Sequence, residues 1–154
     1  MKGDADVIDL LNELLTHELT AINQYFVHSK MCANWGYHRI AKKKRSESIE
    51  EMHHADWVID RILFLDGVPN MQRLNPVRVG EDVVEQHQLD LEVEARERLN
   101  RGVHLCTQRG DTGTRVLLEK ILTSEEDGID WLEAQLNVIK DIGKERYLAE
   151  QLGE

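Results

Sequence analysis

The sequence predicts an all-α protein, a four-helix bundle with one long crossover and a short fifth helix near the C-terminal end. Apolar residues recur with a period near 3.6 along most of the chain, and no alternating strand pattern stands out. Both prolines, Pro69 and Pro76, fall in one stretch, so the segments on either side are free to be helical. The 154 residues have about the size of one domain, and we expect residues 1–154 to form a single domain.

The first two helices are expected to form a hairpin. The first runs from Ala5 to Asn34, and Gly36 ends it. The second runs from Tyr37 to Leu65 and ends at Asp66-Gly67. The apolar stripes that would face the bundle are Val7, Leu11, Leu14, Ile22 and Tyr25 on the first helix and Ala55, Val58, Ile62 and Leu65 on the second.

A stretch with both prolines follows, and it is longer than a helix hairpin needs. The third helix is expected from Glu81 to Arg109, the fourth from Thr112 to Ile142 and the short fifth from Lys144 to Leu152, with Gly110 and Gly143 as the breaks. Two helix hairpins joined by one long crossover make a ferritin-like four-helix bundle. The apolar stripe of the fourth helix is Leu118, Ile121, Leu122, Ile129, Leu132 and Leu136.

Composition narrows the class of function. The formal net charge of −10 makes nucleic acid and anionic membranes poor partners and favours cations. Two distant cysteines, Cys32 and Cys106, argue against a disulfide framework or a zinc site. The N-terminal residues do not resemble a signal peptide, and no apolar run approaches the ~20 residues that span a bilayer. We therefore expect a soluble cytoplasmic protein.

Each of the four long helices places a carboxylate within or beside its apolar stripe. Glu18 precedes Ile22 by four residues, and Glu125 follows Ile121 by four. The other carboxylates and one histidine that share these faces are Glu51, His54 and Glu94. Unpaired buried carboxylates are costly, so they are normally paired or bind metals, and oxygen ligands with an imidazole suit iron or manganese. A single glutamate near a stripe edge would more simply be a surface residue, but four at matching depths predict a metal site.

Di-iron carboxylate bundles use one glutamate from each of two helices and a Glu-x-x-His pair from each of the other two. Glu51 and His54 form one complete pair, but Glu125 is followed by Gly128 where the second histidine would stand. Asp127 and Asp130 lie off the face of Glu125. The second metal position is therefore expected to lack a nitrogen ligand.

Met52 points to the side of the bundle, because it lies about 100° around the helix from Glu51. Apolar residues accompany it, and a second apolar stripe on the first helix exceeds what one core needs. Such a side face indicates a subunit interface, and a two-fold axis would bring two copies of Met52 together. Thioethers can ligate haem, although simple packing is the alternative. The residues of the two stripes are Ile49, Ile59 and Leu63, and Leu15, Leu19, Ile22 and Phe26.

The remaining histidines lack carboxylates at ligand spacing. We expect His53 to be exposed. The histidines expected at the surface or bonded internally are His17, His28, His38, His87 and His104.

The chain resembles the bacterioferritins, the haem-containing ferritins of bacteria, over nearly its whole length. The resemblance implies a hollow cage of 24 subunits that stores ferric iron as mineral. It also implies Fe(II) oxidation by oxygen or peroxide at a di-iron centre within each subunit. The segments that carry it are MKGD, NELLTHELTAINQYFVHSKM, ESIEEMHHAD, RILFLDGVPN, DWLEAQLNVI and YLAEQL.

By motif position, the resemblance puts the family's last histidine ligand on Gly128, where this chain departs from the pattern. It implies b-type haem held between two subunits by one Met52 from each, and it matches Tyr25 and Trp131 to aromatics near the iron centre. Glu47 and Glu50 would face the mineral cavity. The metal ligands that it implies are Glu18, Glu51, His54, Glu94 and Glu125.

A kept haem methionine beside an incomplete iron centre resembles the haem-bearing chain of a two-chain cage. Its partners would be a second bacterioferritin subunit with complete ferroxidase ligands and a ferredoxin-type electron donor. As a homopolymer, the chain is expected to oxidise Fe(II) weakly. Two alternatives stay open: a chain that is a ferroxidase by itself, with water in place of the lost nitrogen, and a purely structural or haem-carrying subunit of a mixed cage.

Overall fold

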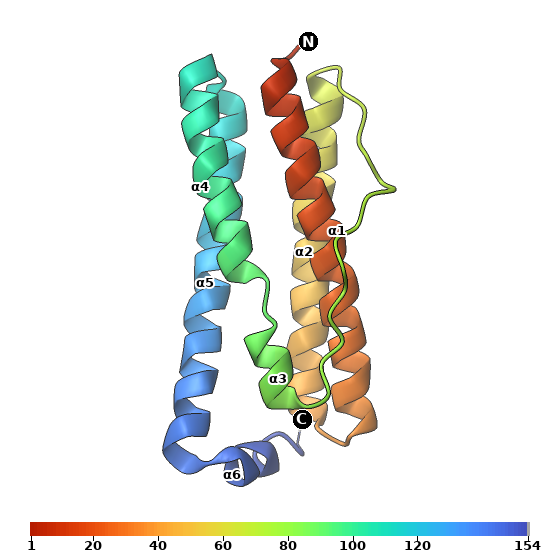
Figure 1. The fold of residues 1–154 in the computed structure, drawn as a ribbon, viewed down its shortest axis with the longest axis vertical. Coiled ribbons are helices and arrows are strands. Elements are labelled where there is room, and N and C mark those ends of the chain that lie inside the picture. Colours follow the sequence, from red (N-terminus) through yellow and green to blue (C-terminus); the bar gives the residue numbers. More distant parts are fainter. Residues whose placement is uncertain (154) are drawn as a thin grey trace.

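Two helix hairpins stand side by side in the computed structural model, which describes residues 1–153. One hairpin joins α1 (Ala5–Asn34) to α2 (His38–Phe64), and the other joins α4 (Glu92–Arg109) to α5 (Thr112–Ile142) (Figure 1). All of the secondary structure in this part of the chain is helical. The expected all-α, ferritin-like bundle is confirmed.

The crossover leaves the end of α2, runs along the outside of α1 and reaches α3 (Val83–Gln88) at the opposite end of the bundle (Figure 1). The short α6 (Lys144–Ala149) lies at this same end, far from the N-terminus. No helix of the described residues is long and apolar enough to cross a membrane.

Local sequence signals start and end the helices. The Asp4 carboxylate accepts hydrogen bonds from the backbone N–H groups of Asp6 and Val7, which α1 itself cannot pair. Asp111 does the same for Thr114 at the start of α5. Gly110, which ends α4, has a φ of 69°, a left-handed conformation that glycine adopts without steric cost.

The prediction of one continuous third helix from Glu81 to Arg109 was wrong. The structure has two helices there, α3 and α4, separated by residues 89–91. Side chains satisfy the backbone groups that the break frees. The Asp90 carboxylate accepts from the Glu92 backbone N–H at 2.8 Å, and Gln24 donates to the Leu89 carbonyl at 2.8 Å. The break sets which face of α4 turns toward the bundle. The fifth helix is also shorter than expected, since it ends at Ala149.

The apolar core occupies the half of the bundle near the N-terminus, where leucine, isoleucine and valine side chains of all four long helices interlock. A second apolar cluster joins α6 to the other end. The interior also contains a small third apolar cluster of Ala21, Tyr25 and Leu91, and buried polar and ionisable side chains. The fully buried members of the main cluster include Val7, Leu11, Leu15, Val58, Ile62, Leu118 and Ile121.

A ladder of polar side chains on α1 holds the crossover. Its members recur every four residues, so they form one row along the helix. Asn12 accepts from the Asn70 backbone N–H at 2.7 Å, Thr20 from Asn75 at 3.0 Å, and Gln24 from Arg78 at 3.0 Å. These bonds pair backbone groups that a segment without helix or sheet would otherwise leave to water. The row is Asn12, Thr16, Thr20, Gln24 and His28.

Three histidines expected to be superficial or satisfied are buried, namely His17, His28 and His87. His87 lies in a hydrogen-bonded chain: Lys44 Nζ donates to its Nδ1 at 3.1 Å, and its Nε2–H donates to the Tyr147 hydroxyl at 3.0 Å. Tyr147 in turn donates to Gln135 at 2.8 Å. The chain ties α3, α2, α6 and α5 together at one end of the bundle, and it requires a neutral His87.

The ladder predicts that Gln24→Ala destabilises the protein by about 2 kcal/mol, since the Arg78 N–H and the Leu89 carbonyl would each lose a buried partner. The measurement is chemical or thermal unfolding of the metal-free protein. Asn23→Ala is the matched control, because Asn23 is exposed and bonds only within its own helix. Equal stability of the two variants would contradict the role of the ladder.

His87 makes the stability depend on pH. Burial and the neighbouring charge of Lys44 lower its pKa to about 3, below its ordinary value of 6.5. The unfolded chain therefore takes up this proton below pH 6.5 and the folded chain does not, so stability falls as pH falls, by up to about 1.4 kcal/mol per unit. We expect His87→Gln to reduce the loss of Tm between pH 7 and pH 5 but not to abolish it, because burial also lowers the pKa of His17 and His28 to about 4. His104→Gln, at an exposed histidine, should keep the wild-type slope.

Candidate metal centre

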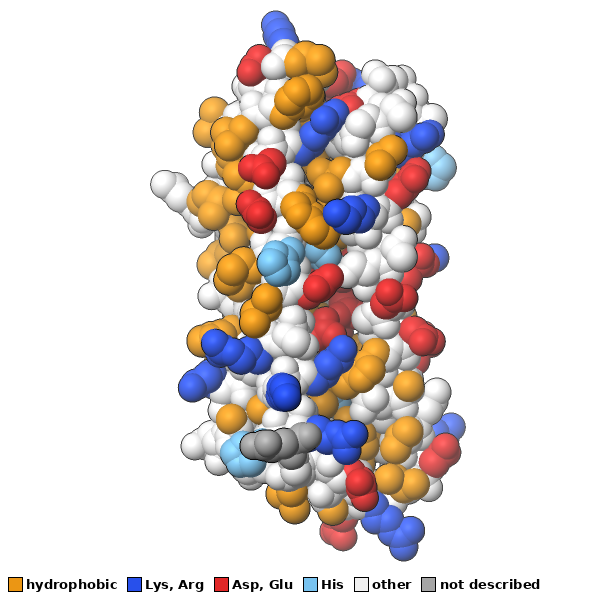
Figure 2. Space-filling view, turned by 180° about the vertical axis from the view of Figure 1, so that it is seen from behind, with side chains coloured by type: hydrophobic (Ala, Val, Ile, Leu, Met, Phe, Trp, Pro, Cys, Tyr) orange, Lys and Arg blue, Asp and Glu red, His pale blue; other side chains and the backbone are white. Residues whose placement is uncertain are grey.

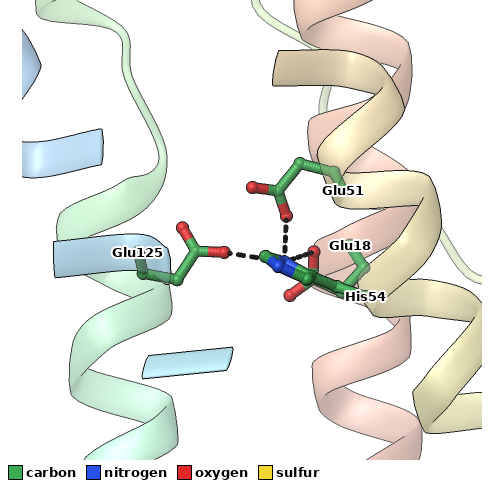
Figure 3. A group of neighbouring side chains, drawn as sticks. All are labelled: Glu18, Glu51, His54 and Glu125. Carbon is green, nitrogen blue, oxygen red and sulfur yellow. Dashed lines mark hydrogen bonds and ion pairs between the residues drawn. The ribbon is translucent and has the colours of Figure 1, made fainter. Parts of the chain in front are cut away.

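Four ionisable side chains converge at mid-height between the two hairpins. Glu18 comes from α1, Glu51 and His54 from α2, and Glu125 from α5, and all point toward one another (Figure 3). One ligand atom of each lies within 4.8 Å of the others. All four are buried. The structure thus brings together four of the five side chains that the sequence suggested.

The His54 ring lies at the centre of this cluster. Its Nδ1 is 3.4 Å from Glu51 Oε2, 3.7 Å from Glu18 Oε2 and 3.3 Å from Glu125 Oε1. The spacing of three between Glu51 and His54 puts both on one face of α2, toward the bundle. One imidazole nitrogen and three carboxylates therefore face a common point.

Burial and mutual proximity shift the pKa values of the ionisable groups in the cluster. Burial raises the pKa of Glu18, and burial with the nearby Glu51 raises that of Glu125 to about 8. Burial would lower the pKa of His54, but the surrounding carboxylates raise it to about 12. Without a metal, the histidine is therefore a cation that partly neutralises the carboxylates.

Three buried atoms of the cluster have no hydrogen-bond partner among the described residues: Glu18 Oε2, Glu125 Oε1 and His54 Nε2. Buried polar atoms are nearly always paired, so such orphans call for an ion or a water. Three hard oxygen donors and one imidazole form a donor set suited to iron or manganese. The residues present thus fit a divalent metal ion.

Glu94 lies outside the cluster. Its side chain is half exposed and pairs with Arg78 at 3.4 Å and with Arg98 at 4.0 Å. The register of α4 explains this placement, because the buried row of that helix runs through Ala95 and Leu99, and Glu94 is turned about 100° away from Ala95. The structure does not bring Glu94 to the other four.

Glu92, the buried carboxylate of α4, was not predicted from the sequence. It is 3% exposed and lies in the buried row with Ala95 and Leu99. Its spacing of three and seven residues before these two was a signal that could have found it. The expected continuous helix hid its significance, since the break before Glu92 was not predicted.

A cleft of about 260 Å³ lies beside Gly128. Acidic groups dominate its charge, although Lys43 also lines it. In Figure 2 acidic side chains gather in a hollow between the two hairpins. Asp127 and Asp130 are exposed, off the face of Glu125 as the spacing predicts. The acidic lining consists of Glu47, Glu50 and Asp127.

Met52 lies on the outside of α2, with its side chain 56% exposed. Exposed apolar residues accompany it on α1 and α2, and Figure 2 shows hydrophobic side chains along the α1–α2 flank. His53 is exposed, as expected. The apolar residues that we call the outer flank are Phe26, Ile49 and Leu63.

The two aromatics singled out in the sequence take different places. Tyr25 is buried, and its hydroxyl accepts from the Leu91 backbone N–H at 3.4 Å, next to Glu92. Trp131 lies with the His87 network instead, at 5.8 Å between ring centroids, and Lys43 sits over its ring. Tyr25 is therefore the aromatic that borders the carboxylates.

A helix-hairpin pair around a buried carboxylate–histidine cluster is a ferritin-like protein, and the ferritin-like domain family matches residues 8–142. More particular relatives are bacterioferritins. Those of Mycobacterium leprae and Mycobacterium tuberculosis are each 51% identical over 97% of this chain and 96% of their own length. The bacterioferritin of Streptomyces coelicolor is 50% identical over 97% of this chain and 90% of its own.

The structure of Mycobacterium tuberculosis bacterioferritin BfrA superposes with a TM-score of 0.97 at 50% identity, covering 99% of this chain and 98% of that one. The chain belongs to the bacterioferritin family, which confirms the resemblance seen in the sequence. Membership makes it an iron-storage subunit and implies iron binding and a ferritin-type oligomeric assembly.

The cluster predicts that Glu51→Gln removes the stabilisation that a divalent ion gives. We expect Co²⁺ to raise the Tm of the wild type by about 5 °C or more and that of the variant hardly at all. The metal-free Tm should change little, because burial raises the pKa of Glu51 and a neutral glutamine resembles the protonated acid. Asp56→Asn, an exposed change on α2, should keep the full Co²⁺ effect. A full Co²⁺ effect in Glu51→Gln would contradict the assignment.

Proposed function

We propose that the chain, as one domain over residues 1–154, is the subunit of a 24-subunit iron-storage cage that takes up Fe(II) at Glu18, Glu51, His54 and Glu125. The observation that carries this is the convergence of three buried carboxylates and one imidazole nitrogen on one point, where Glu18 Oε2 and Glu125 Oε1 have no hydrogen-bond partner. Buried polar atoms without such a partner call for an ion or a water. Fe(II) is the substrate that they receive.

The protein side of iron uptake follows from the geometry. The acidic cleft beside Gly128 attracts cations to the surface, and its lining residues Glu50 and Ser124 are sequence neighbours of Glu51 and Glu125. Binding displaces the proton of His54, so Nδ1 becomes a ligand instead of a cation. Glu50 Oε1 lies 3.7 Å from Nε2 of the same ring, which is an ion-pair distance and not a hydrogen bond.

We further propose that Met52 ligates b-type haem together with Met52 of a second copy across a two-fold axis. Its exposed thioether and the apolar outer flank fit a flat apolar group shared by two subunits. A haem bound there would supply a route for electrons from a ferredoxin-type donor to stored iron. The chain contributes the thioether and the apolar walls that keep water from it.

Met52→Leu tests the haem proposal. We expect the variant purified from haem-supplied cells to lack the bis-methionine absorption spectrum, since leucine keeps the size and apolar character of methionine but has no sulfur ligand. Met71→Leu is the control, because Met71 is an equally exposed methionine on the crossover. An unchanged spectrum in Met52→Leu would exclude Met52 as the ligand. Size-exclusion chromatography shows whether each variant still assembles.

We propose that the homopolymer oxidises Fe(II) slowly because position 128 gives no nitrogen to the second iron, and that fast oxidation comes from a second subunit type in a mixed cage. Rapid mixing of the purified homopolymer with Fe(II) and oxygen tests this. A rate close to the protein-free blank is expected. Fast oxidation of two Fe(II) per subunit would instead favour a chain that is a ferroxidase by itself. Co-purification with a second ferritin chain would support the mixed cage.

A further inference from the structure

Glu92 places its carboxylate against the α5 backbone at Gly128. A Cβ atom added at Gly128 would collide with Glu92 Cδ and with both of its carboxylate oxygens. Any side chain at position 128 is therefore incompatible with Glu92 where it stands. Glycine within a helix costs about 1 kcal/mol relative to alanine, so its presence there calls for a reason. The reason visible in the structure is the carboxylate that occupies the space.

Glu92 is buried and lacks a full set of hydrogen-bond partners, as is typical of a metal ligand without its metal. It is 3% exposed, and its Oε2 has no hydrogen-bond partner within residues 1–153. The charges that act on it are mainly those of other acids, namely Asp90, Glu47, Glu125 and Glu51. An acid buried among acids without a cation is the arrangement that a bound metal ion stabilises.

The chain holds Glu92 firmly in this place. It is the first residue of α4, where the helix dipole favours a negative charge. Asp90 accepts its backbone N–H at 2.8 Å, and Gln24 and Tyr25 of α1 bind the backbone on either side of Asp90. The break between α3 and α4 thus fixes the backbone from which the buried Glu92 side chain extends.

We propose that Glu92 supplies the second metal position with the donor that Gly128 cannot give, so that a carboxylate of α4 replaces an imidazole of α5. This inference rests on the proposed iron site, to which Glu92 adds a neighbouring position. Glu92 lies beyond the group of four whose ligand atoms lie within 4.8 Å of one another, so it serves a separate ion beside that group. The centre is then unsymmetrical: one position holds His54, and the other has oxygen ligands only.

The ligand chemistry follows from this asymmetry. Carboxylate oxygens without imidazole suit hard divalent cations, and Mn²⁺ and Fe²⁺ belong to the ions that such sites accept. We expect the second position to bind Mn²⁺ and to bind it more weakly than the position with His54. A position with only oxygen ligands agrees with slow Fe(II) oxidation by the homopolymer.

Crystals of the whole protein soaked in MnCl₂ test the proposal, read by anomalous scattering between the helices. The wild type should show two peaks, one at the cluster of four and one next to Glu92. Glu92→Ala should keep the first peak and lose the second. Glu94→Ala is the matched control, since Glu94 lies two residues away on the same helix with its carboxylate at the surface, and it should keep both.

Each outcome decides one claim. No peak in the wild type would overturn the proposed iron site itself. One peak in the wild type, or two in Glu92→Ala, would leave the iron site standing and overturn the role of Glu92. Loss of the second peak in Glu94→Ala alone would transfer that role to Glu94. Glu92→Gln, which keeps the shape of the side chain, replaces Glu92→Ala if the alanine variant does not fold.

A change at position 128 gives an independent readout without altering Glu92. Gly128→Ala should displace the Glu92 carboxylate and weaken the second Mn²⁺ peak several-fold, while the first peak stays. Gly128→His alone should also lack the second Mn²⁺ peak, because the new side chain would overlap with the Glu92 carboxylate. Glu92→Ala combined with Gly128→His should bring the second ion back. Two full peaks in Gly128→His alone would contradict the exchange.

Discussion

The structure depends on one electrostatic constraint: ionisable groups of both hairpins meet in the middle of the bundle, away from water. Three of the four come from the α1–α2 hairpin and Glu125 from α5, so the cluster joins the two halves of the molecule. Carboxylates this close repel one another unless a cation lies between them. In the metal-free protein, the protonated ring of His54 is that cation. A metal ion would take over this positive charge, and the neutral ring of His54 would become one of its ligands.

The rest of the fold holds the helices in place, although the carboxylates at the centre repel one another. Apolar packing on the N-terminal side and the His87 hydrogen-bonded chain at the other end hold the helices, so the centre need not contribute to stability. Such a division is common at binding sites, where unfavourable groups persist because the surrounding structure fixes them. The acidic cleft beside Gly128 attracts cations to the surface of this arrangement.

The fold and most of the centre could be predicted from the sequence because both depend on helical periodicity. Glu18 and Glu125 interrupt apolar stripes, and Glu51 with His54 shares a face, so their convergence followed from spacing alone. The inward position of Glu92 on α4 could not be predicted in this way. Its orientation depends on the break at residues 89–91, which side chains of α1 stabilise, and such long-range contacts leave no local pattern. A shift of two residues in one helix was enough to exchange Glu94 for Glu92.

The polar row on α1 has a consequence for how this chain can change over evolutionary time. Most of its bonds reach backbone groups of the crossover, at Val68, Asn70, Asn75 and Arg78, and every residue except proline carries these groups. Substitutions in the crossover are therefore tolerated as long as the spacing between anchored positions is kept. An inserted or deleted residue, by contrast, would shift every later backbone group of the crossover away from its hydrogen-bond partner on α1. The crossover therefore tolerates substitutions but not insertions or deletions.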